Sequence, residues 1–174
     1  MSRQLEPYQL IERSIQKKFH KVLWTPFITA IKQYELIAPG DRIAVCISGG
    51  KDSMLMAKLL QLLQRHSDVP FEVIDLVMDP GYNAVNRQKI ESNAALLHIP
   101  VTIFETNIFD VTSGVEQSPC YLCARMRRGY LYSKARELGC NKIALGHQPQ
   151  FPGHGAHPPH VLHPRGRHHR LAAL

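Results

Sequence analysis

Apolar and polar positions follow three successive patterns along this chain of 174 residues. Residues 1–40 carry apolar side chains at helical spacing, and residues 41–147 alternate short apolar runs with longer helical patterns. In residues 148–174 the apolar positions show neither helical spacing nor strand-like runs. Period and run length are the main sequence signals for helices and strands. The pattern therefore predicts an N-terminal helical segment, a central α/β domain and a tail without regular structure.

The N-terminal segment is expected to form two basic helices, over residues 8–18 and 27–34. Thr25 suits the N-cap of the second helix, and Pro26 suits its first helical position, where no amide hydrogen is needed. Three lysines cluster near the break between the helices: Lys17, Lys18 and Lys21. They form either a solvated face or a surface that contacts RNA, and the sequence leaves both interpretations open.

The central domain is predicted to alternate strands and helices. Strands are expected at residues 42–47, 71–78, 101–105 and 141–145, and helices at residues 54–63 and 83–98 and within residues 120–138. Such alternation implies right-handed βαβ crossovers and a Rossmann-like parallel sheet covered on both faces. Ligands of these sheets bind at the carboxyl ends of the strands. Four loops should therefore meet at one edge: residues 48–53, 79–82, 106–107 and 146–147.

The loop after the first strand, Ser-Gly-Gly-Lys-Asp-Ser at residues 48–53, has the composition of a phosphate cradle. Its glycines let backbone N–H groups converge on an anion, the helix that follows adds unpaired N–H groups, and Lys51 adds a full charge. The spacing differs from that of the Walker loop and of the dinucleotide-binding fingerprint. The alternative is a glycine-rich turn without a ligand, which would not need the surrounding Ser, Lys and Asp side chains.

Composition narrows the class of protein. No run of about 18 apolar residues is present, and the N-terminus lacks the pattern of a signal peptide, so we expect a cytoplasmic protein without a membrane span. The four cysteines are then expected to be thiols, ligands or catalysts rather than disulfides. Cys46 and Cys140 fit small buried hydrophobic residues. The formal net charge of +7 favours a polyanionic partner.

Cys120 and Cys123 form a Cys-x-x-Cys pair at the expected junction of a loop and a helix. A helix N-terminus and neighbouring arginines favour the thiolate that binds iron or attacks sulfur. Half of a zinc site, a dithiol redox pair and two cysteines without a role remain open. The arginines that follow suit a tRNA backbone or a solvated helix face: Arg125, Arg127 and Arg128.

Together these motifs resemble known families. The loop at residues 48–53 resembles the pyrophosphate loop (PP-loop) of the N-type ATP pyrophosphatases. With Cys120 and Cys123, the arginines at residues 127–128 and the Ala-Leu-Gly-His sequence at residues 144–147, the chain resembles the tRNA 2-thiocytidine synthetase family and, more distantly, tRNA(Ile)-lysidine synthetase. The resemblance implies ATP-dependent replacement of the C2 oxygen of cytidine 32 by sulfur. It also implies Mg²⁺, a [4Fe-4S] cluster, a homodimer, tRNA as substrate and a sulfur donor such as a cysteine desulfurase.

The resemblance also implies roles for residues. Lys51, Asp52 and the two cysteines of the pair would be catalytic, and those cysteines would hold the cluster. Asp52 would orient the loop or a Mg²⁺-bound water, and capping of the following helix is the alternative. ATP would contact the following residues: Ser48, Gly49, Gly50, Lys51, Asp52, Ser53, Met78, Gly146 and His147.

The tail departs from the family pattern. Gln148 follows His147, so the second His and the Asp of a Gly-His-His-x-x-Asp loop are missing, as is a third cysteine ligand. Residues 148–174 hold six of the ten histidines and no acid. We therefore expect a disordered or non-native tail, a central domain that is incomplete at its C-terminal end, and little turnover. A lysidine-type adenylating ligase and a non-enzymatic adenine-nucleotide-binding module remain alternatives.

Overall fold

The structure is a computed structural model. It describes the backbone of residues 4–107, 119–146, 160–162 and 168–170, and the side chains within residues 4–107 and 125–146. None of the described helices is both long enough and apolar enough to span a membrane. His147 and most of the tail lie outside the described residues, so the expectation of an irregular tail stays a prediction. Two short antiparallel strands are described there, β5 (His160–Leu162) and β6 (His168–Arg170).

The N-terminal segment is almost continuously helical. It comprises α1 (Pro7–Arg13), the π-helical turns η1 (Ser14–Lys18) and η2 (His20–Trp24), and α2 (Thr25–Gln33). The expected break is confined to Phe19, whose φ is −102°. The predicted N-cap is wrong: Trp24 occupies that position in helical conformation, and Thr25 is already the first residue of α2. Because the preceding turn is also helical, the Thr25 hydroxyl does not cap and instead lies 3.2 Å from Nδ1 of His20.

The expected alternation of strands and helices is confirmed. The central elements are β1 (Arg42–Ile47), α3 (Lys51–His66), β2 (Glu72–Asp79), α4 (Ala84–Leu96), β3 (Val101–Glu105), α6 (Pro119–Glu137) and β4 (Lys142–Leu145). Helix α3 extends three residues further at each end than predicted, so part of the glycine loop is its first turn. The absence of Gly and Pro from α3 agrees with its length of 16 residues.

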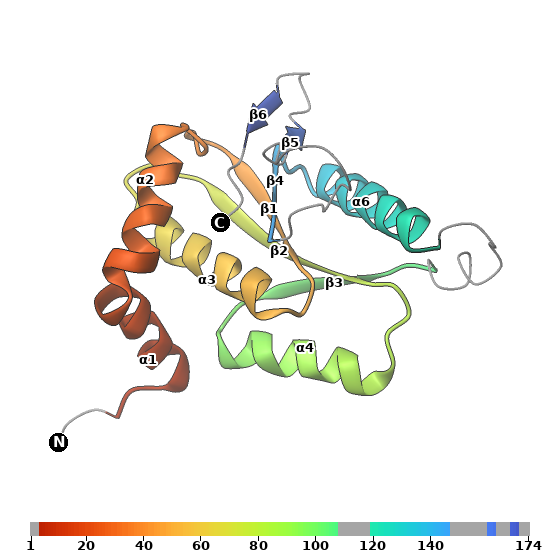
Figure 1. Cartoon of the computed structure of the whole chain (residues 1–174), viewed down its shortest axis with the longest axis horizontal. Coiled ribbons are helices and arrows are strands. Elements are labelled where there is room, and N and C mark those ends of the chain that lie inside the picture. The colour runs from red at the N-terminus through yellow and green to blue at the C-terminus, as the bar shows by residue number, and fades with distance from the viewer. Residues whose placement is uncertain (1–3, 108–118, 147–159, 163–167, 171–174) are drawn as a thin grey trace.

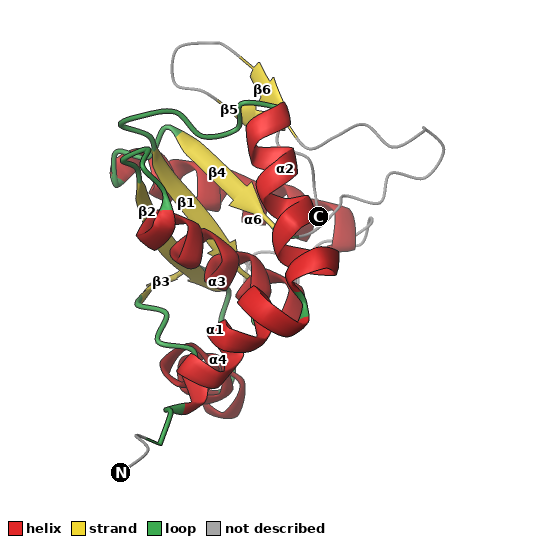
Figure 2. Cartoon of the chain, turned by 90° about the vertical axis from the view of Figure 1, so that its left-hand side faces the viewer, coloured by secondary structure: helices red, strands yellow, loops and turns green. Residues whose placement is uncertain are grey.

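The four central strands form one parallel sheet in the order β3-β2-β1-β4. Helices α3 and α4 lie on one face of this sheet, and α6 lies on the other (Figures 1 and 2). The chain moves outward from β1 to β3 and then returns through α6 to place β4 on the other side of β1. The sheet therefore has a topological switch point between β1 and β4. The predicted α/β fold class is confirmed.

Successive side chains of β1 pack into two hydrophobic layers, one on each face of the sheet. Val45 belongs to the larger layer beneath α3 and the N-terminal helices, and Ala44 and Cys46 belong to the smaller layer beneath α6. Both Cys46 and Cys140 are buried in the smaller layer, as expected. Burial, and secondarily Cys140, raises the pKa of the Cys46 thiol to about 12. Burial also raises the pKa of Cys140, so both are small hydrophobic side chains at neutral pH.

A buried polar network joins the amino ends of β1 and β4. Nζ of Lys142 lies 2.6 Å from Oδ2 of Asp41 and donates to the carbonyl of Leu36 at 2.7 Å. Asn141 donates to the other carboxylate oxygen of Asp41 at 2.7 Å. Burial alone would raise the pKa of Asp41, but the hydrogen bonds from Lys142, the Ala38 amide and Asn141 outweigh it and lower this pKa.

A second buried ion pair attaches α1 to the central domain. Lys58 of α3 is 1% exposed, and its Nζ lies 2.6 Å from Oε1 of Glu12. Arg65 donates to both oxygens of Glu12, at 3.0 and 2.8 Å. Lys58 also donates to the Leu97 carbonyl at 2.7 Å. The N-terminal segment is thereby held by satisfied charges as well as by apolar packing.

Among the described buried charged residues, Asp75 differs in having a carboxylate oxygen without a hydrogen-bond partner. It lies at the centre of β2, opposite Val45 of β1 and Val101 of β3, and is 3% exposed. Within the described residues its Oδ1 accepts no hydrogen bond. Burial raises the pKa of Asp75 to about 7. The protein therefore favours the protonated carboxyl.

This geometry predicts how stability depends on pH. An aspartate titrates near 3.9 in unfolded chains, so folding takes up a proton between about pH 4 and pH 7, and Asp75 lowers stability progressively over that window. We expect the free energy of unfolding of Asp75→Asn, relative to wild type, to rise by about 4 kcal/mol from pH 4 to pH 7 and then level off. Urea unfolding at several pH values measures this. Asp68→Asn, at an exposed position, is the control, and identical pH profiles for wild type and Asp75→Asn would contradict the prediction.

Candidate nucleotide-binding site

The glycine loop turns β1 directly into α3. Gly49 has a φ of +85°, in the left-handed region that favours glycine, and Gly50 is the extended N-cap of the helix. No hydrogen bond from an N-cap side chain closes this helix end. Lys51 and Asp52 lie in the first turn of α3, whose amide hydrogens point out of the helix end. This end of α3 therefore offers several N–H donors and a positive dipole to an anion.

Two serines fix the shape of the loop. The Ser53 hydroxyl donates to the Gly50 carbonyl at 2.9 Å and accepts the Ser48 amide at 3.1 Å. The hydroxyls of Ser48 and Ser53 lie 3.2 Å apart. Ser53 is 2% exposed, so its hydroxyl acts inside the loop. The side chain of Ser53, a predicted ATP contact, is therefore engaged in hydrogen bonds within the loop.

Two glycines permit close packing around this loop. A Cβ on Gly49 would lie 2.9 Å from Cγ1 of Ile90 in α4. A Cβ on Gly146, just after β4, would lie 3.0 Å from Cα of Ser53. The end of β4 therefore approaches the first turn of α3 at the switch point, as the sequence predicts. His147, the next predicted residue, lies outside the described residues.

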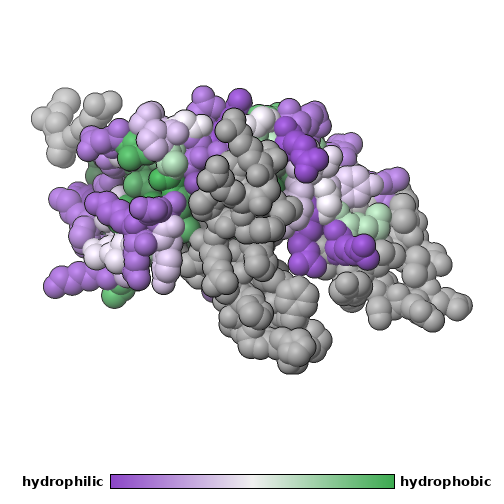
Figure 3. Space-filling view, turned by 90° about the horizontal axis from the view of Figure 1, so that it is seen from above, coloured by the Kyte–Doolittle hydropathy of each residue, from purple (hydrophilic) through white to green (hydrophobic). Residues whose placement is uncertain are grey.

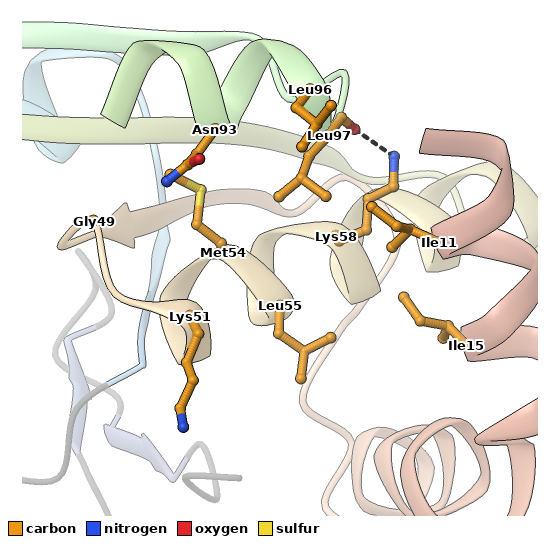
Figure 4. A pocket seen from close by; sticks show the side chains of 10 residues that line it. All are labelled: Ile11, Ile15, Gly49, Lys51, Met54, Leu55, Lys58, Asn93, Leu96 and Leu97. Carbon is orange, nitrogen blue, oxygen red and sulfur yellow. Dashed lines mark hydrogen bonds between the residues drawn. The ribbon is translucent and has the colours of Figure 1, made fainter. Parts of the chain in front are cut away.

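Lys51 borders a cavity of about 330 Å³ beside the loop (Figure 4). The walls come from α1, η1, α3 and the C-terminal end of α4. They are mainly aliphatic: Ile11, Ile15, Met54, Leu55, Leu96 and Leu97. Asn93 provides an amide near Met54 (Figure 4). Asp52 is exposed in the first turn, and because Gly50 is the N-cap, the capping role considered for Asp52 is not found. Its charge still favours the positive end of the helix dipole.

A third part of the strand edge is organised by Asp79, which was not predicted as a site residue. Its Oδ1 accepts the amides of Gly81 and Tyr82 at 2.9 and 2.6 Å. Its carbonyl accepts the Thr106 amide at 2.8 Å, which joins the ends of β2 and β3. The Asp-Pro-Gly sequence after a buried strand is a turn signal that would have indicated this role. The predicted ATP contact Met78 precedes it and is 7% exposed.

Arg87 of α4 balances the carboxylates at this edge. Its Nη1 lies 3.3 Å from Asp79 and 2.5 Å from Glu105, and its Nε lies 3.2 Å from Glu91. Hydrogen bonds to Glu105 and Glu91 raise the pKa of Arg87. The Asp79 carboxylate is thus already engaged by Arg87 and by the backbone amides of Gly81 and Tyr82. It serves to position the loop at residues 79–82.

Helix α6 carries the predicted cysteine pair and arginines. The backbone places Cys120 and Cys123 at the start of this helix, but their side chains lie outside the described residues. Arg125 is exposed, whereas Arg127 and Arg128 are half-buried. Among the side chains that the structure describes, no three His, Cys, Asp or Glu residues converge on a metal position.

The close approaches predict different effects for three Gly→Ala substitutions. Gly49→Ala places a side chain at positive φ against Ile90, and Gly146→Ala places one against the backbone of α3, so each should lower the free energy of unfolding by about 1–3 kcal/mol. Gly129→Ala is the matched control, because a Cβ there meets open space in α6 and should stabilise by up to about 1 kcal/mol. Urea unfolding measures all three. Equal stability of the Gly49 and Gly129 variants would show that the loop geometry is wrong.

Comparison with known proteins gives matches to individual proteins, whereas no protein-family model matches. The tRNA-cytidine(32) 2-sulfurtransferase of Citrifermentans bemidjiense is 39% identical over 121 residues, which are 68% of this chain and 48% of that protein. The protein of the same name from Nitrosospira multiformis is 37% identical over 139 residues, 78% of this chain and 47% of that protein.

A solved structure gives independent support for the fold. The U34-tRNA thiolase NcsA from Methanococcus maripaludis, determined with its [4Fe-4S] cluster, matches with a TM-score of 0.56 and 23% identity, over 69% of this chain and 43% of that one. At this identity the likeness shows the fold alone. The chain spans about half the length of these curated relatives. The resemblance predicted from the motifs is confirmed, because over the matched residues this chain is homologous to the tRNA-cytidine(32) 2-sulfurtransferases.

Proposed function

We propose that this chain forms the ATP-binding part of a tRNA thiolase that replaces the C2 oxygen of cytidine 32 by sulfur. The observation that carries the proposal is the loop at residues 48–53, which lies at the switch point of the sheet and is closed by Gly146. This geometry is that of an anion site at a helix N-terminus. The names of the curated relatives support cytidine as the target.

The cytosine C2 oxygen is a poor leaving group and therefore has to be activated before sulfur can replace it. The cytosine C2 oxygen attacks the α-phosphorus of ATP, the bond to the β-phosphate oxygen breaks, and pyrophosphate departs. The adenylated oxygen then leaves as AMP when a sulfur nucleophile adds to C2. Lys51 and the amides at the start of α3 stabilise the charge that develops on pyrophosphate. Mg²⁺ would add to this stabilisation, with Asp52 as a candidate to orient its water.

The cysteine pair fits two ligand positions of one cluster. The backbone of Cys120 and of Cys123 lies at the start of α6, and the Cys-x-x-Cys spacing suits two ligands of one cluster. A bound [4Fe-4S] cluster would supply sulfur-transfer chemistry. Cys46 and Cys140 do not suit a third position, because both are buried and have raised thiol pKa values.

Several further features belong to this proposal. The arginines of α6 would contact tRNA, with Arg125 the most exposed of them. A sulfur donor such as a cysteine desulfurase, a homodimer and a cytoplasmic location stay predictions. The first two follow from the resemblance.

Nucleotide binding is the first test. Lys51→Ala removes the only full charge of the loop that matches phosphate, so ATP affinity in the presence of Mg²⁺ should fall about tenfold or more, and any tRNA-dependent pyrophosphate release should fall about 10²-fold. Calorimetry and a pyrophosphate assay with bulk tRNA measure the two effects. Lys89→Ala, an exposed change on α4, is the control. Folded wild-type protein that takes up no ATP would overturn the proposed function.

Cluster binding separates the thiolase from a lysidine-type ligase, which needs no cysteine pair. Protein purified anaerobically should contain iron and absorb in the visible range, and Cys120→Ser or Cys123→Ser should each abolish both signals. Cys140→Ala is the matched control, because this buried cysteine should leave the iron content unchanged. A colourless wild-type protein with fully reactive Cys120 and Cys123 would favour the lysidine-type ligase.

A further inference from the structure

The N-terminal helical segment packs apolar side chains inward and exposes basic side chains at the same four-residue spacing, together with the apolar residues Leu10, Phe19 and Val22. Ile11, Ile15, Leu23 and Phe27 pack into the larger hydrophobic layer. Between them, Arg13, Lys17 and Lys21 are all exposed. The π-helical turns η1 and η2 maintain this spacing across Phe19. We refer to Arg13, Lys17 and Lys21 as the basic stripe.

The charge of the basic stripe is not balanced locally. Residues 13–34 contain no Asp or Glu. Within the described part of the chain, the ion pairs involve other cations, such as Lys58 and Arg65 with Glu12, and none involves the basic stripe. Nζ of a neighbouring lysine, Lys18, lies 5.3 Å from the centroid of the Phe19 ring. The left-hand end of the molecule, where the N-terminal helices lie, presents many hydrophilic side chains to solvent (Figure 3).

The helical segment that carries the basic stripe borders the candidate nucleotide site. Ile15, on the buried side of the same helical segment, and Lys51 of the glycine loop line one cavity (Figure 4). A polyanion bound to the basic stripe would lie on the outer side of the segment whose inner side borders this cavity. A membrane surface fits less well, because an interfacial helix inserts its apolar face into lipid, whereas Ile15 and Phe27 are 3% exposed and already packed.

We propose that the basic stripe binds the phosphate backbone of the RNA substrate and holds it beside the glycine loop. This inference rests on the proposed function, since it names where the tRNA of that reaction is held. Unpaired Lys and Arg side chains on an exposed face are the typical contacts to nucleic-acid phosphates. Such contacts fix position without reading the sequence.

The test compares two double variants with equal loss of charge. Lys17→Ala/Lys21→Ala should weaken binding of unmodified tRNA transcript about tenfold and reduce the magnitude of the log–log salt slope by about 1.5, from two lost phosphate contacts. Lys32→Ala/Lys89→Ala, two exposed lysines outside the stripe, should change neither quantity. Fluorescence anisotropy at several salt concentrations measures both, and circular dichroism checks that each variant is folded.

ATP calorimetry on the same proteins separates this inference from the proposed function. Retained ATP binding with weakened tRNA binding in the stripe variant alone supports the inference. Equal tRNA binding by both double variants overturns the inference about the basic stripe but not the proposed nucleotide site. Wild-type protein that binds ATP and anionic phosphatidylserine vesicles but not tRNA also overturns it.

Discussion

The pairing of β4 with β1 joins residues about a hundred positions apart, and two contacts at opposite edges of the sheet depend on it. At the amino edge, Lys142 and Asp41 form a buried ion pair with further hydrogen bonds to both partners. At the carboxyl edge, Gly146 packs against Ser53 of α3. Removing one member of a buried pair costs about 3–5 kcal/mol, because the other charge stays buried. The strand that completes the switch point is therefore anchored at the edge opposite the site.

A buried ion pair also attaches the N-terminal segment to the central domain. Lys58 and Glu12 are satisfied by one another, by Arg65 and by the Leu97 carbonyl, so α1 is fixed against α3 and α4. This attachment turns the apolar side of the segment inward and leaves its basic side exposed. Structure and proposed recognition are thus linked, because the contact that stabilises the fold also decides which side chains meet a polyanion.

Asp75 shows the cost of a buried carboxyl without such partners. It lies among apolar residues of the central strands, and its pKa is raised by burial alone. Asp41 is only 5% exposed but has a lowered pKa, because Lys142, the Ala38 amide and Asn141 donate hydrogen bonds to it. The two aspartates therefore make opposite contributions to the pH dependence of stability: Asp41 favours folding above the pKa of unfolded aspartate, and Asp75 disfavours it there.

The sequence by itself determined the local features: the alternating elements, the glycine turn at residues 48–53, the edge on which the loops gather, and the burial of Cys46 and Cys140. These depend on period, turn chemistry and hydrophobicity, which are encoded by neighbouring residues. It placed the cap at Thr25 wrongly, because the turn before it is also helical. Only the tertiary structure decided which distant side chains pair, such as Lys142 with Asp41, or whether a buried carboxylate finds a partner. Those contacts arise from packing between elements, and no local pattern specifies them.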